Sequence, residues 1–482
     1  MKRILPFLLF LTILTNCNDT SEKEKEQQLL NERIARIEDG VQSVLEIQMG
    51  DSTIVNYYNI EDRMKELEIP GLSIAVMYNG EVEWAKGYGM ADSSENRKVT
   101  SKTLFQAGSI SKPVAATRAH QLTEEGKMSL DNNVNDYLTS WKLPDTTFTE
   151  NEKVTLRRML NHTAGLTIWG FPGYSRTDTI PSVTDILDGK GNTGAVRVYK
   201  EPGGDWQYSG GGYTIMQLMV TDTDNKAFED TMQEHVLNPL GMTSSTYENP
   251  LPEKYHGLAA TGYLRDGSAV EGKWHIYPEM AAAGLWTTPS QLVLWSGEIQ
   301  DILQTQRNDG ILKAETVNEM LTGNDDDQGL GPYVVEHIFG HGGADEGFRA
   351  ELKAWKELPI TVAIMSNSDN GGRIFDEVFL SIAKEYDLPG IEPRKRTYTK
   401  QSKESLERFV GEYDFPDRSA TITLKDDGLE FVGGPADAPI YLLPEDDTTY
   451  FSSKTGLYFN FEVENDIVTG LKVSRYEVKK IN

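Results

Sequence analysis

Two pairs of strand-like runs at opposite ends of one long stretch are the feature that most restricts how this chain can fold. Residues 72–77 and 82–88 are joined at Asn79-Gly80, the strongest short signal for a β-hairpin. Residues 348–355 and 360–366 form a second such pair, and helical runs lie between the two pairs. This pattern predicts an α+β fold with an antiparallel sheet, because a doubly wound parallel sheet would alternate strand and helix throughout.

With 482 residues the chain is long enough for more than one domain. We predict a signal-peptide region at residues 1–17, a tether and N-terminal helix at 18–50, the main α+β domain at 51–388, a linker at 389–405 and a C-terminal β domain at 406–482. Residues 18–28 have the acidic and polar composition of a solvated tether, and residues 29–45 have helical spacing. The linker combines prolines with the basic cluster Arg394-Lys395-Arg396. Beyond it, short strand-like runs separated by turn signals predict a small all-β, barrel-like domain.

The N-terminus has the layout of a secretory signal. Lys2 and Arg3 precede a run dominated by apolar residues at 4–14, which is shorter than the ~20 residues that a membrane-spanning helix needs. The run ends in Leu14-Thr15-Asn16-Cys17, whose placement resembles a bacterial lipobox. Cys17 is the only cysteine, which excludes a disulfide within one chain. We expect an exported bacterial lipoprotein anchored to the bilayer through a lipid on Cys17, and an ordinary signal peptide containing a cysteine is the alternative.

The charge balance argues against a nucleic-acid partner. Lys and Arg number 47 and Asp and Glu number 74, so the net charge is −27. A field of this sign repels phosphate backbones. The expected partner is a small-molecule or peptide substrate, and the sequence leaves the oligomeric state open.

A serine and a lysine three positions apart are the first candidates for chemistry. Serine becomes a nucleophile when a base takes its proton. On a helix, the spacing of Ser109 and Lys112 places both side chains on one face, one turn apart. A lysine that acts as the base must lose its charge, which burial, a nearby cation or a helix N-terminus favours, so we expect an enclosed site. Pro113 disfavours helical angles at Lys112, although the first turn of a helix tolerates a proline.

The S-x-x-K pattern is weak by itself, since a chain of this size contains about one or two matches by chance. Ser381-Ile382-Ala383-Lys384 is a second match, and we expect it on the solvated face of an amphipathic helix. Lys454-Thr455-Gly456 looks like a known active-site triplet but falls in the β domain, where it predicts a turn between strands.

The stretches around the candidate residues carry more weight. In chain order they are Phe105-Gln106-Ala107-Gly108-Ser109-Ile110-Ser111-Lys112, Leu160-Asn161-His162-Thr163-Ala164-Gly165-Leu166, Pro202-Gly203 with Trp206-Gln207-Tyr208-Ser209, Asn238-Pro239-Leu240-Gly241-Met242, Ala282-Ala283-Gly284-Leu285 and His341-Gly342-Gly343. Together they resemble the motifs of the serine β-lactamase and penicillin-binding superfamily, closest to class C β-lactamases, D-alanyl-D-alanine carboxypeptidases and related esterases. The resemblance spans roughly residues 61–381.

The resemblance implies a β-lactamase/transpeptidase-like antiparallel sheet flanked by helices, with a helical subdomain. The C-terminal β domain resembles the lipocalin-like domains that follow this hydrolase fold in some bacterial proteins. The resemblance also implies that Ser109 is the acylated nucleophile and Lys112 its proton acceptor. Tyr208 would pass protons to the leaving group and to the incoming water, and His341 would assist from the opposite wall.

The resemblance further implies that the backbone N–H groups of Ser109 and Ala344 form the oxyanion hole, where donors face the developing negative charge. Gly342 and Gly343 suit substrate binding, because a strand edge without side chains lets a substrate approach the backbone. Gly210, which we also predict to be at the substrate-binding site, departs from the family pattern, in which the tyrosine motif commonly ends in Asn. The missing amide is expected to hold a substrate amide, so efficient β-lactam turnover is in doubt while acyl transfer is not.

The sequence therefore favours a serine hydrolase that forms an acyl-enzyme on Ser109 from an amide, peptide, β-lactam or ester carbonyl, without a metal or another cofactor. A non-catalytic receptor of the same fold, binding peptide or glycan at the cell surface, is the alternative that Gly210 keeps open. A metallohydrolase is a further rival because His337 and His341 are four apart and His275 is available, although the glycines at 340–343 argue against a helix there.

Each candidate also has a structural interpretation when it is judged singly. Tyr208 is compatible with a half-buried aromatic residue and His341 with a surface residue. For both, the shared context of the motifs favours catalysis. We expect His162 to have a structural role.

Overall fold

The computed structural model describes residues 13–416, 418–436 and 438–481, with side chains from residue 23 onward. The chain divides into two compact units, which are described separately: the sheet unit (Glu61–Phe375) and the barrel unit (Met1–Ile60 with Asp376–Asn482). The predicted signal-peptide run at 4–14 lies almost wholly outside the described residues, and so does the side chain of Cys17. In the part of the chain that is described, no helix combines the length and the apolar character needed to cross a bilayer.

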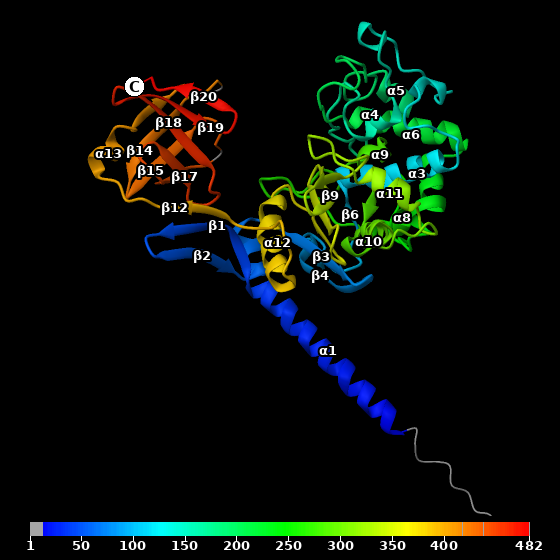
Figure 1. The fold of residues 1–482 in the computed structure, drawn as a ribbon, viewed down its shortest axis with the longest axis horizontal. Coiled ribbons are helices and arrows are strands. Elements are labelled where there is room, and N and C mark those ends of the chain that lie inside the picture. The colour runs from blue at the N-terminus through cyan, green and yellow to red at the C-terminus, as the bar shows by residue number, and fades with distance from the viewer. Residues whose placement is uncertain (1–12, 417, 437, 482) are drawn as a thin grey trace, which may run out of the picture. The chain divides into compact units, whose positions relative to one another are not determined.

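The sheet unit is built on a seven-stranded sheet in the order β5-β4-β3-β11-β10-β9-β8 (Figure 1). Every neighbouring pair in it is antiparallel. Its strands are β3 (Gly71–Tyr78), β4 (Glu81–Asp92), β5 (Arg97–Lys98), β8 (Tyr333–Val335), β9 (Ile338–Asp345), β10 (Phe348–Trp355) and β11 (Ile360–Ser366). The antiparallel sheet and the predicted α+β class are confirmed.

The two predicted hairpins form the centre of this sheet. Asn79 and Gly80 join β3 to β4 with φ angles of 52° and 80°, the left-handed conformation that a two-residue hairpin turn needs. β11 then pairs with β3, so strands from the two ends of the unit lie side by side. All residues of β11 are buried, which is typical of a strand covered on both faces.

Helix α10 packs against β3 and β11. It begins at Pro289, and the side chain of Thr288 accepts a hydrogen bond from the Gln291 N–H at this end. It ends at Thr305, and the next residue, Gln306, adopts a left-handed conformation. The helices of the sheet unit are α2 (Ile60–Glu66, starting at the boundary), α3 (Ser111–Glu124), α4 (Leu156–Leu160), α5 (Val183–Leu187), α6 (Gly210–Asp224), α7 (Phe228–Met232), α8 (Glu253–His256), α9 (Met280–Ala283), α10 (Pro289–Thr305) and α11 (Ala314–Met320). Short helical turns occur at η1 (Gly108–Ile110), η2 (Val134–Asp136), η3 (Thr147–Thr149) and η4 (Gln233–Leu237).

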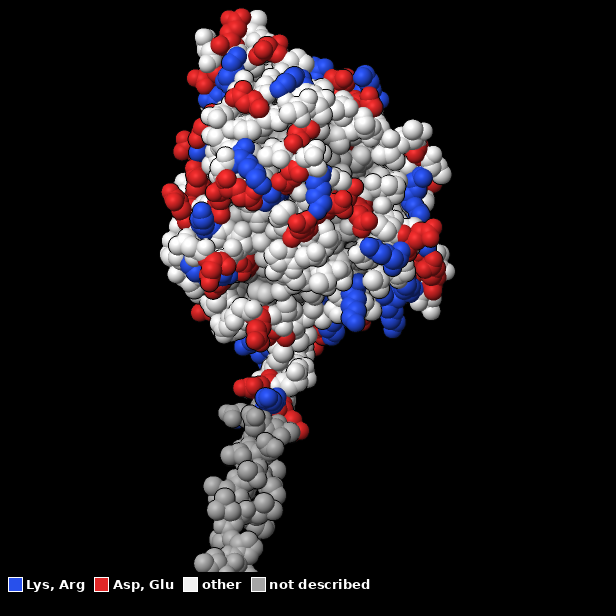
Figure 2. Space-filling model, turned by 90° about the vertical axis from the view of Figure 1, so that its right-hand side faces the viewer, with Lys and Arg blue, Asp and Glu red and all other residues white. Residues whose placement is uncertain are grey.

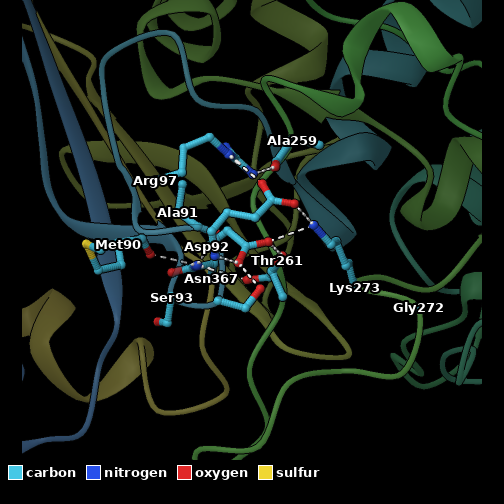
Figure 3. A network of polar contacts seen from close by, with 12 residues as sticks. Met90, Ala91, Asp92, Ser93, Arg97, Ala259, Thr261, Gly272, Lys273 and Asn367 are labelled. Atoms are coloured by element: carbon cyan, nitrogen blue, oxygen red, sulfur yellow. Dashed lines mark hydrogen bonds and ion pairs between the residues drawn. The ribbon is translucent and has the colours of Figure 1, made fainter.

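A buried polar network holds a long connection against the end of β4 (Figure 3). Asp92 accepts hydrogen bonds from Thr261 Oγ1 at 2.7 Å and Lys273 Nζ at 2.8 Å. These bonds lower the pKa of the Asp92 carboxyl against the opposing effect of burial. Asn367 donates from its amide to the carbonyl oxygens of Ala91 and Thr261. The segment that leads from Thr261 toward α9 is therefore hydrogen-bonded to the sheet at the end of β4, through Asp92, and just after the end of β11, through Asn367.

The barrel unit contains a three-stranded sheet that joins the predicted tether region to the predicted linker. β1 (Val41–Met49) pairs with β2 (Ser52–Tyr58) in antiparallel fashion and with β12 (Arg394–Thr397) in parallel fashion. The linker is thus partly a strand, and the helix predicted at 29–45 is wrong at 40–45, most of which belongs to β1. Local spacing fits a helix there, but pairing with a strand distant in sequence overrides it.

The tether predicted at 18–28 is helical, as part of α1 (Ile13–Asp39). The segment contains no Gly or Pro, and side chains one turn apart interact in it, as in the hydrogen bond from Gln28 to Glu32 at 2.9 Å. α1 ends at Gly40, where a Cβ would lie 2.5 Å from the carbonyl oxygen of Arg36. The acidic and polar composition of residues 18–28 is therefore compatible with a solvent-exposed helix and does not by itself indicate an extended chain.

The second S-x-x-K match lies in α12 (Gly372–Tyr386), and its predicted solvated position is wrong for the serine. Ser381 is buried, and its hydroxyl donates to the carbonyl oxygen of Ile37 in α1 at 3.0 Å. Lys384 is exposed and lies over the ring of Tyr57. This serine has a packing role.

The C-terminal part forms an eight-stranded antiparallel sheet in sequence order from β13 to β20. A bridge between Tyr413 and Lys480 brings its first and last strands together, so the predicted barrel-like domain is confirmed. The interior is filled by aromatic side chains, among them Phe409, Tyr450 and Phe461. Lys454-Thr455-Gly456 lies in the connection between β17 and β18, as predicted. The remaining elements are α13 (Lys403–Glu407), β13 (Gly411–Tyr413), β14 (Ala420–Lys425), β15 (Gly428–Gly433), β16 (Ile440–Pro444), β17 (Thr449–Ser452), β18 (Tyr458–Glu464), β19 (Ile467–Val473) and β20 (Tyr476–Lys479).

Acidic side chains are numerous on the face that Figure 2 presents, with Lys and Arg side chains placed among them. This distribution agrees with the net charge of −27.

Candidate active site

The serine and the lysine meet at the start of α3. Ser109 lies in η1, and Lys112 lies in the first turn of the helix that follows. Lys112 Nζ donates to Ser109 Oγ at 3.0 Å and to the carbonyl oxygen of Ala282 at 2.8 Å. Lys112 is only 2% exposed, which agrees with the predicted enclosure. Pro113 lies in the same first turn, where a missing N–H does not disturb the helix.

A short strand pair brings these two segments together. β6 (Phe105–Gln106) precedes the nucleophile and pairs with β7 (Trp286–Thr287), which follows α9. The Ala107 N–H also donates to the carbonyl oxygen of Leu285 at 2.9 Å. This pairing explains how Ala282, far away in sequence, reaches the lysine amine.

Tyr208 and His341 complete the predicted set of four side chains. Lys112 Nζ lies 5.0 Å from the centre of the Tyr208 ring, and that ring centre lies 6.3 Å from the centre of the His341 ring. Tyr208 comes from the segment before α6 and His341 from β9. The structure thus brings an amine, a phenol and an imidazole around one hydroxyl, while their catalytic roles stay predictions.

The His341 ring is buried and neutral. Burial, reinforced by the nearby positive charge of Lys112, lowers its pKa to about 4. Its Nδ1 lies 2.6 Å from the carbonyl oxygen of Gly342. A carbonyl oxygen only accepts, so Nδ1 carries the proton and Nε2 retains its lone pair.

His162 supports Tyr208 from behind, in line with the structural role expected for it. Their ring centres lie 4.3 Å apart. His162 Nδ1 accepts a hydrogen bond from the Ser209 N–H at 3.1 Å. Burial lowers the pKa of His162 well below its usual value, so this ring is also neutral. The residue therefore fixes the backbone and the ring of the tyrosine segment.

The glycines of β9 allow a close approach to the nucleophile segment. A Cβ at Gly343 would lie 2.0 Å from the carbonyl oxygen of Ala107, and a Cβ at Gly108 would lie 2.4 Å from Ala344 N. The segments that carry the two predicted oxyanion-hole amides, Ser109 and Ala344, are therefore adjacent. At Gly343 this packing is itself a reason for glycine, beside the predicted access for substrate. Gly342 is partly exposed at the same edge.

Gly210, which we predicted to contact substrate, is buried as the first residue of α6. A Cβ there would lie 2.9 Å from Phe171 Cε2 and 3.2 Å from the carbonyl oxygen of Trp169. The position faces the segment 167–171 instead. The glycine is explained by the packing of that segment, which no local sequence signal indicates.

Two buried acidic residues near the site were not predicted from the sequence. Glu279 precedes α9 and is fully buried, which raises its pKa to about 8. Asp345 follows Ala344, and burial raises its pKa well above the usual value although Lys112 acts against this. Only the tertiary environment distinguishes these residues from the many other acids of the chain.

The three histidines of the metallohydrolase alternative have separate surroundings. His337 lies beside Glu336 and Glu357, His341 contacts Gly342, and His275 Nδ1 lies 3.0 Å from the carbonyl oxygen of Pro172. Across the described part of the chain, no group of three or more His, Cys, Asp or Glu side chains is placed to hold a metal ion.

Comparison with known proteins identifies the family. The sequence model of the β-lactamase family matches residues 58–385. PbpX of Bacillus subtilis, a penicillin-binding protein by its name, is 26% identical over 335 residues, which are 67% of this chain and 76% of PbpX. The chain therefore belongs to the β-lactamase family, which includes serine hydrolases as well as non-catalytic members.

Solved structures agree with the fold. The octameric penicillin-binding protein homologue from Pyrococcus abyssi matches with a TM-score of 0.58 and 21% identity, over 87% of this chain and 98% of its own. A D-amino acid amidase from Ochrobactrum anthropi, solved with L-phenylalanine amide, matches with a TM-score of 0.56 and 22% identity, over 68% of this chain and 97% of its own. The predicted penicillin-binding fold is confirmed.

Proposed function

We propose that the protein is a serine hydrolase that forms an acyl-enzyme on Ser109. The observation that carries the proposal is the 3.0 Å hydrogen bond between Lys112 Nζ and Ser109 Oγ in a buried setting. Lys112 is placed to act as the base, because its amine lies at hydrogen-bond distance from the serine hydroxyl.

In the proposed reaction, the Lys112 amine first gives up its extra proton and then accepts the Ser109 proton, while Oγ forms a bond to the substrate carbonyl carbon. The N–H groups of Ser109 and Ala344 stabilise the negative charge on the carbonyl oxygen. The bond from the carbonyl carbon to the leaving atom then breaks, and Tyr208 delivers a proton to that atom. Water next attacks the carbonyl carbon of this ester and gives a proton to Tyr208. The bond from that carbon to Ser109 Oγ then breaks, Oγ takes back the proton held by Lys112, and the acid leaves. His341, whose ring centre lies 6.3 Å from that of Tyr208, contributes the lone pair of a neutral Nε2 to these proton transfers.

The candidate substrates are amides, D-amino-acid peptides, β-lactams and esters, which all offer a carbonyl to the same nucleophile. The buried Gly210 leaves no side-chain amide at the position where the family commonly has Asn. We therefore expect slow turnover of β-lactams compared with esters or amides. Assays across these classes at matched concentration test this order.

The decisive experiment is labelling with a serine-reactive fluorophosphonate, read by intact mass. We expect one adduct on the wild-type protein and none on Ser109→Ala. Ser381→Ala is the matched control, because it removes the serine of the other S-x-x-K match and should label normally. A folded wild-type protein that gains no adduct would favour the non-catalytic receptor instead.

We also propose that the enzyme is held at a membrane by a lipid on Cys17, on the basis of the first seventeen residues. Mass spectrometry of the mature protein should show a diacylated or triacylated N-terminal cysteine. An unmodified Cys17 in that spectrum excludes the anchor.

A further inference from the structure

Two tryptophans flank Tyr208 on its solvent side. Trp169 is 70% exposed and its ring lies 5.6 Å from the ring of Tyr208. Trp206 is 38% exposed and its ring lies 6.3 Å from Tyr208. Neither tryptophan has a role in the proposed reaction. An exposed aromatic pair beside the side chain that handles the leaving group is the least explained surface of the site.

The segment that carries Trp169 is held rigidly. The Gly210 N–H donates to the carbonyl oxygen of Trp169 at 3.1 Å, and the Gly211 N–H donates to that of Ile168 at 3.1 Å. Ser209 Oγ donates to the carbonyl oxygen of Thr167 at 2.9 Å. Three consecutive residues at the start of α6 thus anchor three consecutive carbonyls, and Trp169 is presented to solvent from a fixed backbone.

Glycine at position 210 is what allows this arrangement. Any Cβ there would come within 3.2 Å of both the Trp169 carbonyl oxygen and the Phe171 ring. The chain therefore gives up the polar side chain that the family commonly has here and gains an aromatic segment in its place. Position 210 therefore offers no side-chain amide, and the segment packed against it carries the exposed ring of Trp169.

Resting on the proposed function, we propose that Trp169 and Trp206 bind the leaving group of the substrate, and that this group is aromatic or extended and apolar. Tyr208 delivers the proton to the leaving atom, so the substituents of that atom extend toward the rings beside Tyr208. Flat aromatic side chains on a fixed backbone bind such a group without losing much conformational entropy. The acyl part of the substrate lies away from them and is not selected by this pair.

Esters with a common acetyl group and different alcohols test the assignment. Benzyl acetate and ethyl acetate give the same acetyl-Ser109, so only acylation reports on the alcohol. For the wild-type protein we expect kcat/KM to be larger for the benzyl ester. Trp169→Ala should reduce that preference by roughly 10- to 100-fold, the range that a lost apolar contact covers. Trp169→Phe should restore most of it.

The rate of deacylation separates binding from structural damage. Because both esters give the same acetyl-enzyme, the rate of its hydrolysis should be the same for the two esters within each protein, in the wild type as in Trp169→Ala and Trp206→Ala. Phe148→Ala is the matched control, since Phe148 is also an exposed aromatic residue of the same unit, 44% exposed, and lies in η3. It should leave both the preference and deacylation unchanged. An unchanged benzyl preference in both tryptophan variants overturns the proposal, and so does a loss seen instead between ethyl phenylacetate and ethyl acetate.

A binding readout keeps the result separate from the fate of the proposed function. In the Ser109→Ala background, saturation-transfer NMR should detect benzyl acetate on the protein, with a signal that Trp169→Ala abolishes. Binding without any adduct on wild-type Ser109 would reject the hydrolase and retain the aromatic site. An adduct without this binding would retain the hydrolase and reject the site.

Discussion

At the scale of single residues, His341 shows how burial sets the chemistry of the site. Its ring is nearly inaccessible, and Lys112 adds a positive charge nearby, so the protonated form is disfavoured. A neutral imidazole beside the phenol of Tyr208 can take part in proton transfer near neutral pH, whereas an imidazolium would oppose the charge of the lysine.

The lowered pKa of His341 predicts a pH dependence of stability. The folded value is about 4 and an unfolded histidine has about 6.5, so the unfolded chain binds more protons between these values. Stability of the sheet unit should therefore fall as the pH drops through this window, by roughly 3 kcal/mol for this group. Below pH 4 its contribution should level off.

Urea denaturation of His341→Asn at several pH values measures this effect. The variant should lose less stability than the wild type between pH 6.5 and pH 4, whereas His337→Gln, which changes a partly exposed ring, should behave like the wild type. Equal slopes for His341→Asn and the wild type would contradict the burial argument. His162 shifts in the same direction and remains as a common background in all three proteins.

Four residues of the candidate site could be predicted from the sequence because each stands in a recognisable motif. Ser109, Lys112, Tyr208 and His341 were found in this way, and the structure brings them together. Trp169, Trp206 and Glu279 could not be found. An isolated tryptophan or glutamate carries no local signal, and its place beside the site depends on how distant segments pack.

At the scale of elements, a buried ion pair joins α3 to α6. Arg118 is 1% exposed, and its guanidinium donates to Asp224 from Nη2 at 2.7 Å and from Nε at 2.9 Å. It also donates to Glu125 at 2.7 Å. Since α3 carries Lys112 and α6 follows Tyr208, the pair holds the helices on both sides of the site in register.

Removing one partner of this pair should be costly. Asp224→Ala leaves Arg118 with Glu125 as its remaining acidic partner and removes the acceptor of two buried N–H donors, so we expect a loss of about 2–4 kcal/mol in the free energy of unfolding. Asp131→Ala is the matched control, because its pair with Arg157 is exposed and should contribute less than about 1 kcal/mol. Chemical denaturation of both variants gives the comparison. Similar losses at the two sites would show that the α3–α6 pair is not a special restraint.

Elements specified by local chemistry were predicted well. The hairpin of β3 and β4 follows from Asn79-Gly80, which suits the positive φ of its turn. β12 was missed because its strand character depends on pairing with β1, which lies at the other end of the chain. The end of α1 was misplaced for the same reason, since residues of β1 fit a helical pattern until their partners are known.

At the scale of the whole molecule, the two units have separate hydrophobic cores. One core lies within the sheet unit, and the other lies inside the eight-stranded barrel, around aromatic residues such as Phe409 and Phe461. Phe461 is 5% exposed, and its ring centre lies 4.5 Å from that of Phe409.

Phe461→Ala should therefore destabilise the barrel by about 3–5 kcal/mol through the cavity it leaves. The barrel should unfold at a lower temperature in calorimetry, as a transition distinct from that of the sheet unit. Fluorophosphonate labelling of Ser109, measured below that transition, should keep its wild-type rate. A matching loss of labelling would mean that the barrel supports the active site.

The sequence by itself determined the kind of fold and the candidate reacting groups, because turn residues, hydrophobic alternation and nucleophile motifs act through short spacings along the chain. Only the tertiary structure decided that Gly210 lies under an aromatic segment, that two tryptophans face Tyr208, and that the predicted linker pairs with β1. Those features arise from contacts between residues far apart in sequence, and the free energy of such contacts depends on packing that no local pattern encodes.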